Sequence, residues 1–145
     1  MDARELRHVI YSQLAARGTA PSRGALAATA GDRVEELLLE LHQRHAIVLD
    51  DAGEIRMALP FSAVPSNHRV VAGDRSWWAN CAWDALAIPS MLRTDARIEA
   101  QWVDTAEAVD LRVVDGQLTT TSGNADGWVR FAFPAHRWWD DIVET

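Results

Sequence analysis

Apolar residues recur at helical spacing through the first 44 residues, whereas most later segments alternate apolar and polar residues as strands do. Helices and strands that are separated along a chain in this way are typical of an α+β fold. The 145 residues are enough for one domain, or for two small subdomains that share a core. We therefore predict an α+β protein in which a helical region packs on a small, mostly antiparallel sheet.

Three segments of the N-terminal part combine helical spacing with a start or stop signal: about residues 4–17, 21–31 and 33–44. Asp32 and Glu35 predict a capping box at the start of the third helix. Residues 46–59 follow as two short apolar runs around an Asp-Asp-Ala-Gly turn, which predicts a β-hairpin. Three helices and a hairpin in this order predict a winged-helix-like region over residues 1–60.

The second part of the chain, residues 66–145, is predicted as a core domain behind a linker at 60–65. One buried helix is expected over about residues 76–92, bent or ended by Pro89. The strand candidates are residues 69–72, 96–103, 109–114, 117–121 and 128–133. Residues 136–143 have the pattern of a further helix start.

Charge and apolar patterning exclude several classes of protein. The net charge is −7 and all 14 basic residues are arginine, so a general electrostatic footprint for nucleic acid is absent. No apolar run approaches the roughly 18–20 residues that span a bilayer, and the N-terminus lacks the pattern of a signal peptide. A single cysteine is compatible with the cytoplasm. We expect a cytoplasmic protein without a membrane partner.

The predicted third helix is a poor candidate for binding DNA. In a winged helix this element enters the major groove, where affinity rests largely on cations that contact phosphates. Its acidic residues outnumber its basic ones: Glu35, Glu36 and Glu40 against Arg33 and Arg44. We expect a structural module that packs on the second part. DNA binding through Arg17, Arg23 and Arg44 remains the alternative.

Cys81 precedes Asp84 by three residues in an apolar, tryptophan-rich stretch. Positions three apart share a helix face, so the predicted helix would pair one thiol with one carboxylate. A soft nucleophile beside a proton-carrying group is suited to thiolate chemistry. The structural alternatives are a buried thiol and a carboxylate that is hydrogen-bonded in a strand–helix corner.

The segment RSWWANCAWDALAIP, residues 75–89, resembles the core segment of the alkylmercury (organomercurial) lyase family. In that family an aromatic residue precedes the cysteine, Cys-Ala-x-Asp-x-Leu follows, and a proline ends the helix. Residues 92–98 and 21–27 also resemble the family, and the resemblance covers roughly residues 18–140. It implies a winged-helix-like N-terminal region joined to a small mixed-sheet domain.

The resemblance also implies a chemistry, in which two cysteines and one aspartate cleave a carbon–mercury bond. A thiolate captures the soft metal, the aspartate relays a proton to the leaving carbon, and the second cysteine completes binding of the released ion. Cys81 matches the first cysteine and is the implied catalytic thiolate and transient mercury ligand. Asp84 matches the aspartate and is the implied proton shuttle and thiol activator. The second cysteine has no match, because its position falls at about Pro134.

The expected partners are therefore a small-molecule substrate and an exogenous thiol that supplies the second sulfur, and no cofactor is expected. The expected pocket for the organic group is mostly aromatic: Trp78, Trp83, Trp138 and Trp139, with His136 near the thiol. There His136 would lower the pKa of Cys81. A metal site built from His136, Asp140 and Asp141 fits no standard spacing.

Two other functions stay open at this point. The chain is either a repurposed relative that binds or transforms a non-mercurial, small apolar ligand, or a regulator. In the second case a winged helix would bind DNA while the second part of the chain senses a ligand. The sequence does not set the oligomeric state.

Overall fold

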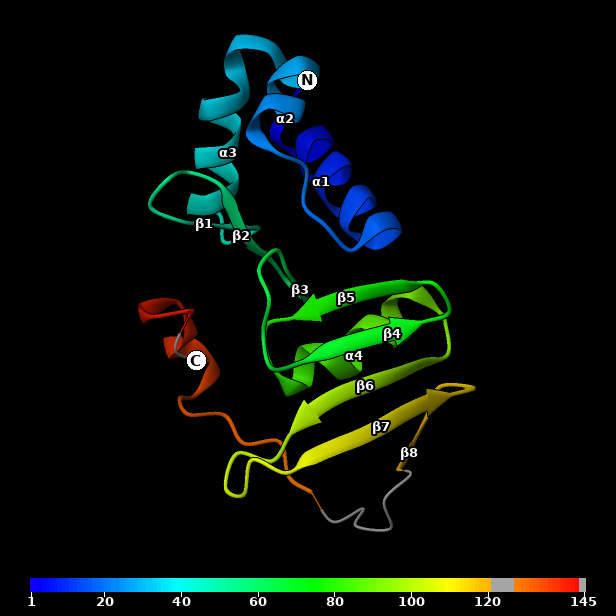
Figure 1. Ribbon diagram of the computed structural model, residues 1–145. Helices are drawn as coiled ribbons and strands as arrows, with labels where there is room; N and C mark the ends of the chain where they lie inside the picture. The colour runs from blue at the N-terminus through cyan, green and yellow to red at the C-terminus, as the bar shows by residue number, and fades with distance from the viewer. Residues whose placement is uncertain (121–126, 144–145) are drawn as a thin grey trace.

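The computed structural model describes residues 1–120 and 127–143, and its chain begins with the predicted helices (Figure 1). They are α1 (Ala3–Arg17), α2 (Arg23–Ala30), the short 3-10 helix η1 (Gly31–Arg33) and α3 (Val34–Gln43). Helix α1 begins at a capping box, in which Asp2 and Glu5 each accept the other's backbone N–H at 2.8 Å. It ends at Gly18, which adopts the left-handed conformation with φ of 71°.

The capping box predicted from Asp32 and Glu35 is wrong. Asp32 lies inside η1, and α3 follows without a side-chain cap. The Val34 amide already donates to the Gly31 carbonyl in η1, so backbone replaces the side chain as a partner at the start of α3. The Glu35 carboxylate pairs with Arg23 of α2 instead.

The strands of the described residues form one sheet in the order β1-β2-β3-β5-β4-β6-β7-β8. Their bounds are Val48–Leu49, Ile55–Ala58, Phe61–Ser62, Arg69–Ala72, Arg75–Ala79, Ala96–Gln101, Ala108–Val114 and Gln117–Thr120 for β1 to β8. All pairings are antiparallel, and the predicted α+β class is confirmed. Thr121, the end of the predicted 117–121 strand, lies outside the described residues.

The predicted linker at 60–65 carries strand β3. Phe61 and Ser62 pair with β2 on one side and with β5 on the other, and both side chains are buried. The flanking prolines predicted a connection, but the two residues after Pro60 are enough to continue the ladder. The N-terminal hairpin and the core sheet therefore share one set of backbone hydrogen bonds. The division into domains at 1–60 and 66–145 stays a prediction.

The helix predicted over 76–92 is wrong in its first part, which forms strand β5. Trp77 is buried and Trp78 is half-buried on the opposite face, which is the alternation of a strand. Aromatic residues also favour strands. Helix α4 (Ala82–Leu92) begins only after Cys81 and continues through Pro89. It lies across one face of β4, β5 and β6 (Figure 1).

The last predicted strand, 128–133, is irregular chain, and the 3-10 helix η2 (Ala135–Asp140) forms where a helix start was predicted at 136–143. Aromatic contacts take the place of a ladder here. Phe131 packs edge-on against Trp83 at 6.1 Å between ring centroids, and its ring stacks on Trp138 at 5.1 Å. Of the alternating apolar residues in this segment, Phe131 makes these ring contacts, while Val129 remains exposed.

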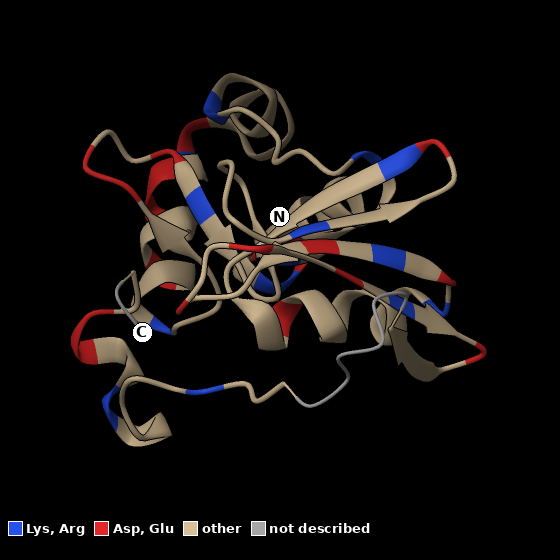
Figure 2. Cartoon of the chain, turned by 60° about the horizontal axis from the view of Figure 1, so that its bottom comes forward, with Lys and Arg blue, Asp and Glu red and all other residues tan. Residues whose placement is uncertain are grey.

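Basic and acidic residues are interspersed along the helices, strands and loops of the chain (Figure 2). Two of the three arginines that a DNA-binding reading needs are engaged with α3 carboxylates: Arg23 with Glu35, and Arg44 with Glu40 at 2.9 Å. This pairing weakens the DNA alternative, which stays a prediction. No helix among residues 1–120 and 127–143 is long and apolar enough to cross a membrane.

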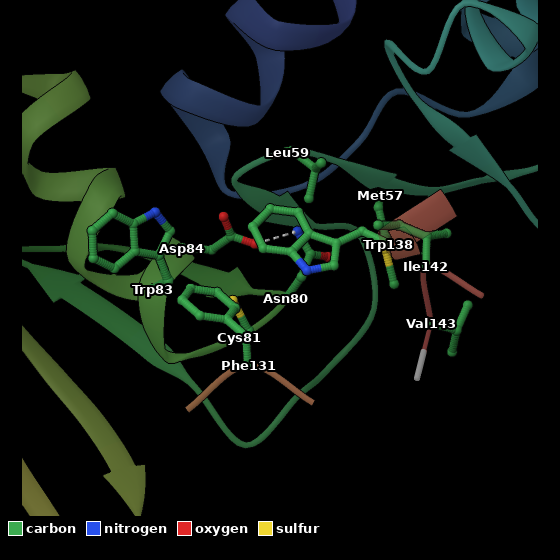
Figure 3. Close-up of a pocket in the computed structure, with 10 residues that line it drawn as sticks. All are labelled: Met57, Leu59, Asn80, Cys81, Trp83, Asp84, Phe131, Trp138, Ile142 and Val143. Carbon is green, nitrogen blue, oxygen red and sulfur yellow. Dashed lines mark hydrogen bonds between the residues drawn. The ribbon is translucent and has the colours of Figure 1, made fainter. Parts of the chain in front are cut away.

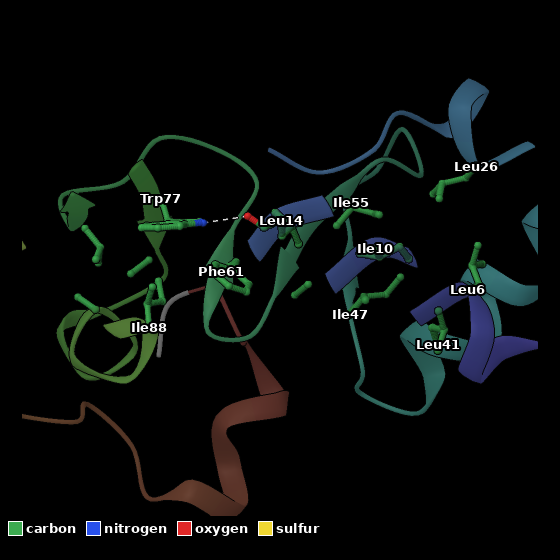
Figure 4. Close-up of a cluster of buried hydrophobic side chains, with 14 of the residues drawn as sticks. Leu6, Ile10, Leu14, Leu26, Leu41, Ile47, Ile55, Phe61, Trp77 and Ile88 are labelled. Atoms are coloured by element: carbon green, nitrogen blue, oxygen red, sulfur yellow. Dashed lines mark hydrogen bonds between the residues drawn. The ribbon is translucent and has the colours of Figure 1, made fainter. Parts of the chain in front are cut away.

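The C-terminus of α1 is joined to β5 by a buried tryptophan (Figure 4). Trp77 is 1% exposed, and its indole N–H donates to the carbonyls of Leu14 at 2.9 Å and Ala15 at 3.1 Å. Next to it, a Cβ on Gly18 would lie 2.0 Å from the Ser76 carbonyl oxygen. Glycine is therefore required at 18, both for its φ and for this close approach.

We predict that Trp77→Phe destabilises the protein by at least about 1–3 kcal/mol, because two buried carbonyls lose their donor and the smaller phenyl ring leaves part of the buried indole site unfilled. The matched control is Trp78→Phe on the other face of β5, which is expected to cost less than about 1 kcal/mol. Urea unfolding of both variants provides the measurement. Equal losses in the two variants would contradict the assigned role of the Trp77 indole.

Candidate active site

Cys81 lies between the end of strand β5 and the first residue of α4. Cys81 is the N-cap of the helix, with extended backbone at φ −148° and ψ 178°, and Asp84 is the third helical residue. The two therefore do not share a helix face as predicted. They meet because N-cap and third-residue side chains face each other across the first helical turn, as they do in a capping box.

The Cys81 thiol is half-buried, and its environment works in two directions. Burial raises its pKa above the ordinary value, while the backbone N–H groups of Asp84 and Trp83 lower it by hydrogen bonding. The Asp84 carboxylate raises it, both by its charge and by accepting the thiol proton. The net pKa is raised, so the free protein holds Cys81 as a thiol.

The Asp84 carboxyl group also has a raised pKa, chiefly because it is buried. Hydrogen bonds from Asn80 and Cys81 partly offset this effect. The Asn80 amide nitrogen donates to Asp84 Oδ2 at 3.2 Å. A carboxyl group whose pKa is moved toward neutrality is suited to carry a proton. In the free protein the Asp84 carboxylate raises the pKa of Cys81, and its predicted role as thiol activator stays a prediction.

Both groups line one pocket with mostly apolar walls (Figure 3). The lining residues are Met57, Leu59, Asn80, Cys81, Trp83, Asp84, Phe131, Trp138, Ile142 and Val143. The walls come from the β2 end, the start of α4 and the C-terminal segment 127–143. The pocket therefore assembles three regions that are far apart in sequence.

Of the five residues predicted to line the pocket beside the thiol and carboxylate, Trp83 and Trp138 do so. The side chain of Trp78 points away from α4, because it lies on the opposite face of β5 from the buried Trp77. The Arg69 guanidinium carbon lies 5.7 Å from the centroid of the Trp78 ring. Trp139 stacks on His45 at 3.9 Å. His136 is exposed and is not among the groups that shift the pKa of Cys81. These three lie outside the described wall.

Sequence reasoning missed several lining residues: Met57, Leu59, Asn80, Phe131, Ile142 and Val143. Asn80 stood next to the thiol in sequence, which was the available signal. The hairpin residues Met57 and Leu59 and the C-terminal lining residues gave no such sequence signal, since only tertiary folding brings them to the site. Pro134, near which the resemblance places the family's second cysteine, is exposed and precedes η2.

Among the described residues, no three His, Cys, Asp or Glu side chains are grouped so that they could hold a metal ion. The one thiol of the pocket wall is therefore accompanied by a carboxyl group rather than by a ligand set for a resident metal. Such a pair can bind a soft cation at sulfur and move a proton at oxygen.

The comparisons with known proteins agree with this geometry. A family model described as alkylmercury lyase matches residues 61–145. The fold is similar to the crystal structure of the mercury-bound form of MerB2, with a TM-score of 0.68 and 25% sequence identity. That similarity covers 84% of this chain and 60% of the MerB2 chain, so this chain spans somewhat over half of that relative. No curated protein matches the sequence.

We predict that alkylation of Cys81 by iodoacetamide rises with pH to a midpoint above that of a free thiol, which is about 8.5. Asp84→Asn should lower this midpoint, because it removes the negative charge that disfavours the thiolate. Asp74→Asn, in the exposed β4–β5 turn, is the matched control. With one cysteine in the chain the rate reports Cys81 alone. An unchanged or higher midpoint in Asp84→Asn would refute this account.

We also predict that Asp84→Asn stabilises the protein at neutral pH. The pKa of Asp84 is higher folded than unfolded, so this group favours folding below the unfolded value, about 3.9, and loses that contribution as pH rises through the folded pKa. The melting temperature of the variant at pH 7 should exceed that of the native chain by about 2–4 °C for each kcal/mol of stability gained. The difference should shrink toward pH 4. A variant that melts earlier at pH 7 would contradict the burial of the charge.

Proposed function

Because this chain belongs to the alkylmercury lyase family, we propose that it cleaves a carbon–mercury bond with Cys81 as the mercury-binding thiolate and Asp84 as the proton carrier. The observation that carries this proposal is the pairing of the two groups at the start of α4, inside one apolar pocket. The thiol supplies softness, and the carboxyl group supplies a proton site within reach of the sulfur.

In the first step the Cys81 sulfur binds the mercury atom of an organomercurial that already carries a small thiolate. Mercury displaces the thiol proton, because a sulfur ligand must be deprotonated to bind a metal. The Asp84 carboxylate accepts that proton. The raised pKa of the free thiol is no obstacle, since the metal itself drives the deprotonation.

In the second step Asp84 returns the proton to the carbon bound to mercury. The carbon–mercury electron pair becomes the new carbon–hydrogen bond, and the hydrocarbon leaves. Mercury remains bound to Cys81 and to the small thiolate. The proton that ends on carbon is the one that left Cys81, so the carboxylate is regenerated.

Product release draws on a thiol from solution, since Cys81 is the only cysteine of the chain. A second small thiol replaces Cys81 on mercury and leaves its proton on the Cys81 sulfur. Mercury departs as a bis-thiolate, and the protein returns to its starting state. The exogenous thiol is therefore consumed in each cycle and is a second substrate.

The aromatic walls suit the organic group of such a substrate. At the pocket the Phe131 ring contacts the rings of both Trp83 and Trp138. Aromatic side chains contribute large apolar area with a defined geometry. A low-polarity wall also strengthens the electrostatic interaction between the reacting groups.

The second candidate function is binding or conversion of a non-mercurial apolar ligand in the same pocket. It is favoured by one observation, the proline at the position that corresponds to the second cysteine. In that case Cys81 would not be needed for binding, and Cys81→Ser would leave ligand affinity nearly unchanged.

The experiment that tests the proposed function is a single-turnover incubation with an arylmercurial and excess small thiol, in which arene release is followed. The native chain should release arene, Cys81→Ser should release none, and Asp84→Asn should be about 10²-fold slower or more, since a proton carrier is lost. Asp74→Asn should behave as the native chain. A stoichiometric mercury adduct on Cys81 without arene would refute lyase activity.

A further inference from the structure

Asn80 connects the catalytic carboxyl group to a distant part of the chain. It stands between the end of β5 and the N-cap Cys81, and its side-chain nitrogen donates to Asp84 Oδ2 and to the Pro60 carbonyl, both at 3.2 Å. A backbone carbonyl only accepts hydrogen bonds, so the atom that faces it must be the amide nitrogen. Both amide protons are therefore engaged, and Figure 3 shows the bond to Asp84.

The rotation of a carboxylate about its last carbon–carbon bond has a broad, shallow preference of its own. A hydrogen bond to one of its oxygens is therefore needed to hold a single orientation. The Asn80 amide is suited to this because its second bond fixes it to Pro60, in the β2–β3 turn, rather than to α4. The amide is therefore anchored outside the helix that carries Asp84.

We propose that Asn80 is a positioning residue, whose amide holds the Asp84 carboxylate in the orientation that exchanges a proton with Cys81. This inference rests on the proposed function, because it assumes that Asp84 carries the proton. It assigns a role to a residue that touches neither the metal nor the carbon in the steps above.

The other side of the amide argues against a purely stabilising role. Asn80 Oδ1 is buried and has no hydrogen-bond partner among the described residues. A buried acceptor without a donor destabilises the folded protein. Removal of the side chain would eliminate this cost together with the two hydrogen bonds, so the net effect on stability is expected to be small. Its effect on Asp84 is expected to be large.

The charge effect of the amide has a definite sign. Its N–H donates to the ionised form of Asp84 and so lowers the pKa of that group against the effect of burial. Without the amide the carboxyl group would hold its proton to higher pH. Since a protonated Asp84 cannot accept the Cys81 proton, activity would then be lost at a higher pH on the acid side.

The test uses the full chain without mercury, with a carbon-13 NMR titration of the Asp84 carboxyl group, whose signal is identified by its absence in Asp84→Asn. Asn80→Ala should raise the Asp84 pKa, and the isosteric Asn80→Asp should raise it further, because two carboxylates then adjoin. Asn67→Ala, which removes an exposed asparagine, should change nothing. An unchanged Asp84 titration in both Asn80 variants overturns the proposal.

The activity arm measures arene release against pH. In Asn80→Ala the acid limb should move to higher pH by the same amount as the NMR titration, with release roughly 10–10²-fold slower at its optimum and a melting temperature close to that of the native chain. A fall in rate with an unmoved acid limb overturns the positioning role. A native chain that releases no arene refutes the proposed function, while the titration still decides whether Asn80 orients Asp84.

Discussion

The bond from the Trp77 indole to the end of α1 sets the position of everything that follows it. Its N–H reaches the Leu14 and Ala15 carbonyls from inside the core, so β5 is held at a fixed depth against the helices. Only two residues, Trp78 and Ala79, lie between Trp77 and Asn80, and Cys81 comes next. A displacement of the Trp77 ring would therefore also displace the Cys81 sulfur, since a strand is an extended, stiff connection.

The site combines two groups that are both held away from their charged forms. Burial disfavours the Cys81 thiolate and the Asp84 carboxylate alike, and each also acts on the other through a shared proton. A neutral Cys81 thiol avoids a second negative charge beside the Asp84 carboxylate, which suits an apolar pocket because unpaired ions are costly there. The raised pKa of Cys81 also explains why the proposed first step needs a soft cation. The affinity of the cation for sulfur offsets the free-energy cost of forming a thiolate in these surroundings.

The sequence predicted the three helices, the fold class and the pairing of Cys81 with Asp84, since each depends on local spacing. The same locality explains the errors. Trp77 and Trp78 were assigned to a helix because the periodicity of a short apolar run is ambiguous, and Phe61 was assigned to a linker because its two strand partners are distant or very short. Leu59 and Phe131 reach the pocket only through tertiary packing, which no spacing rule records.

Strand β3 has a consequence for how this protein can be divided. The family match begins at residue 61, which is the first residue of β3, whereas the partner strand β2 lies before it. A fragment that begins at the match would turn a two-residue inner strand into a sheet edge with Phe61 uncovered. Open edges of this kind recruit other chains. The hairpin of the N-terminal part thus covers an edge of the sheet that carries Cys81, in addition to completing its core.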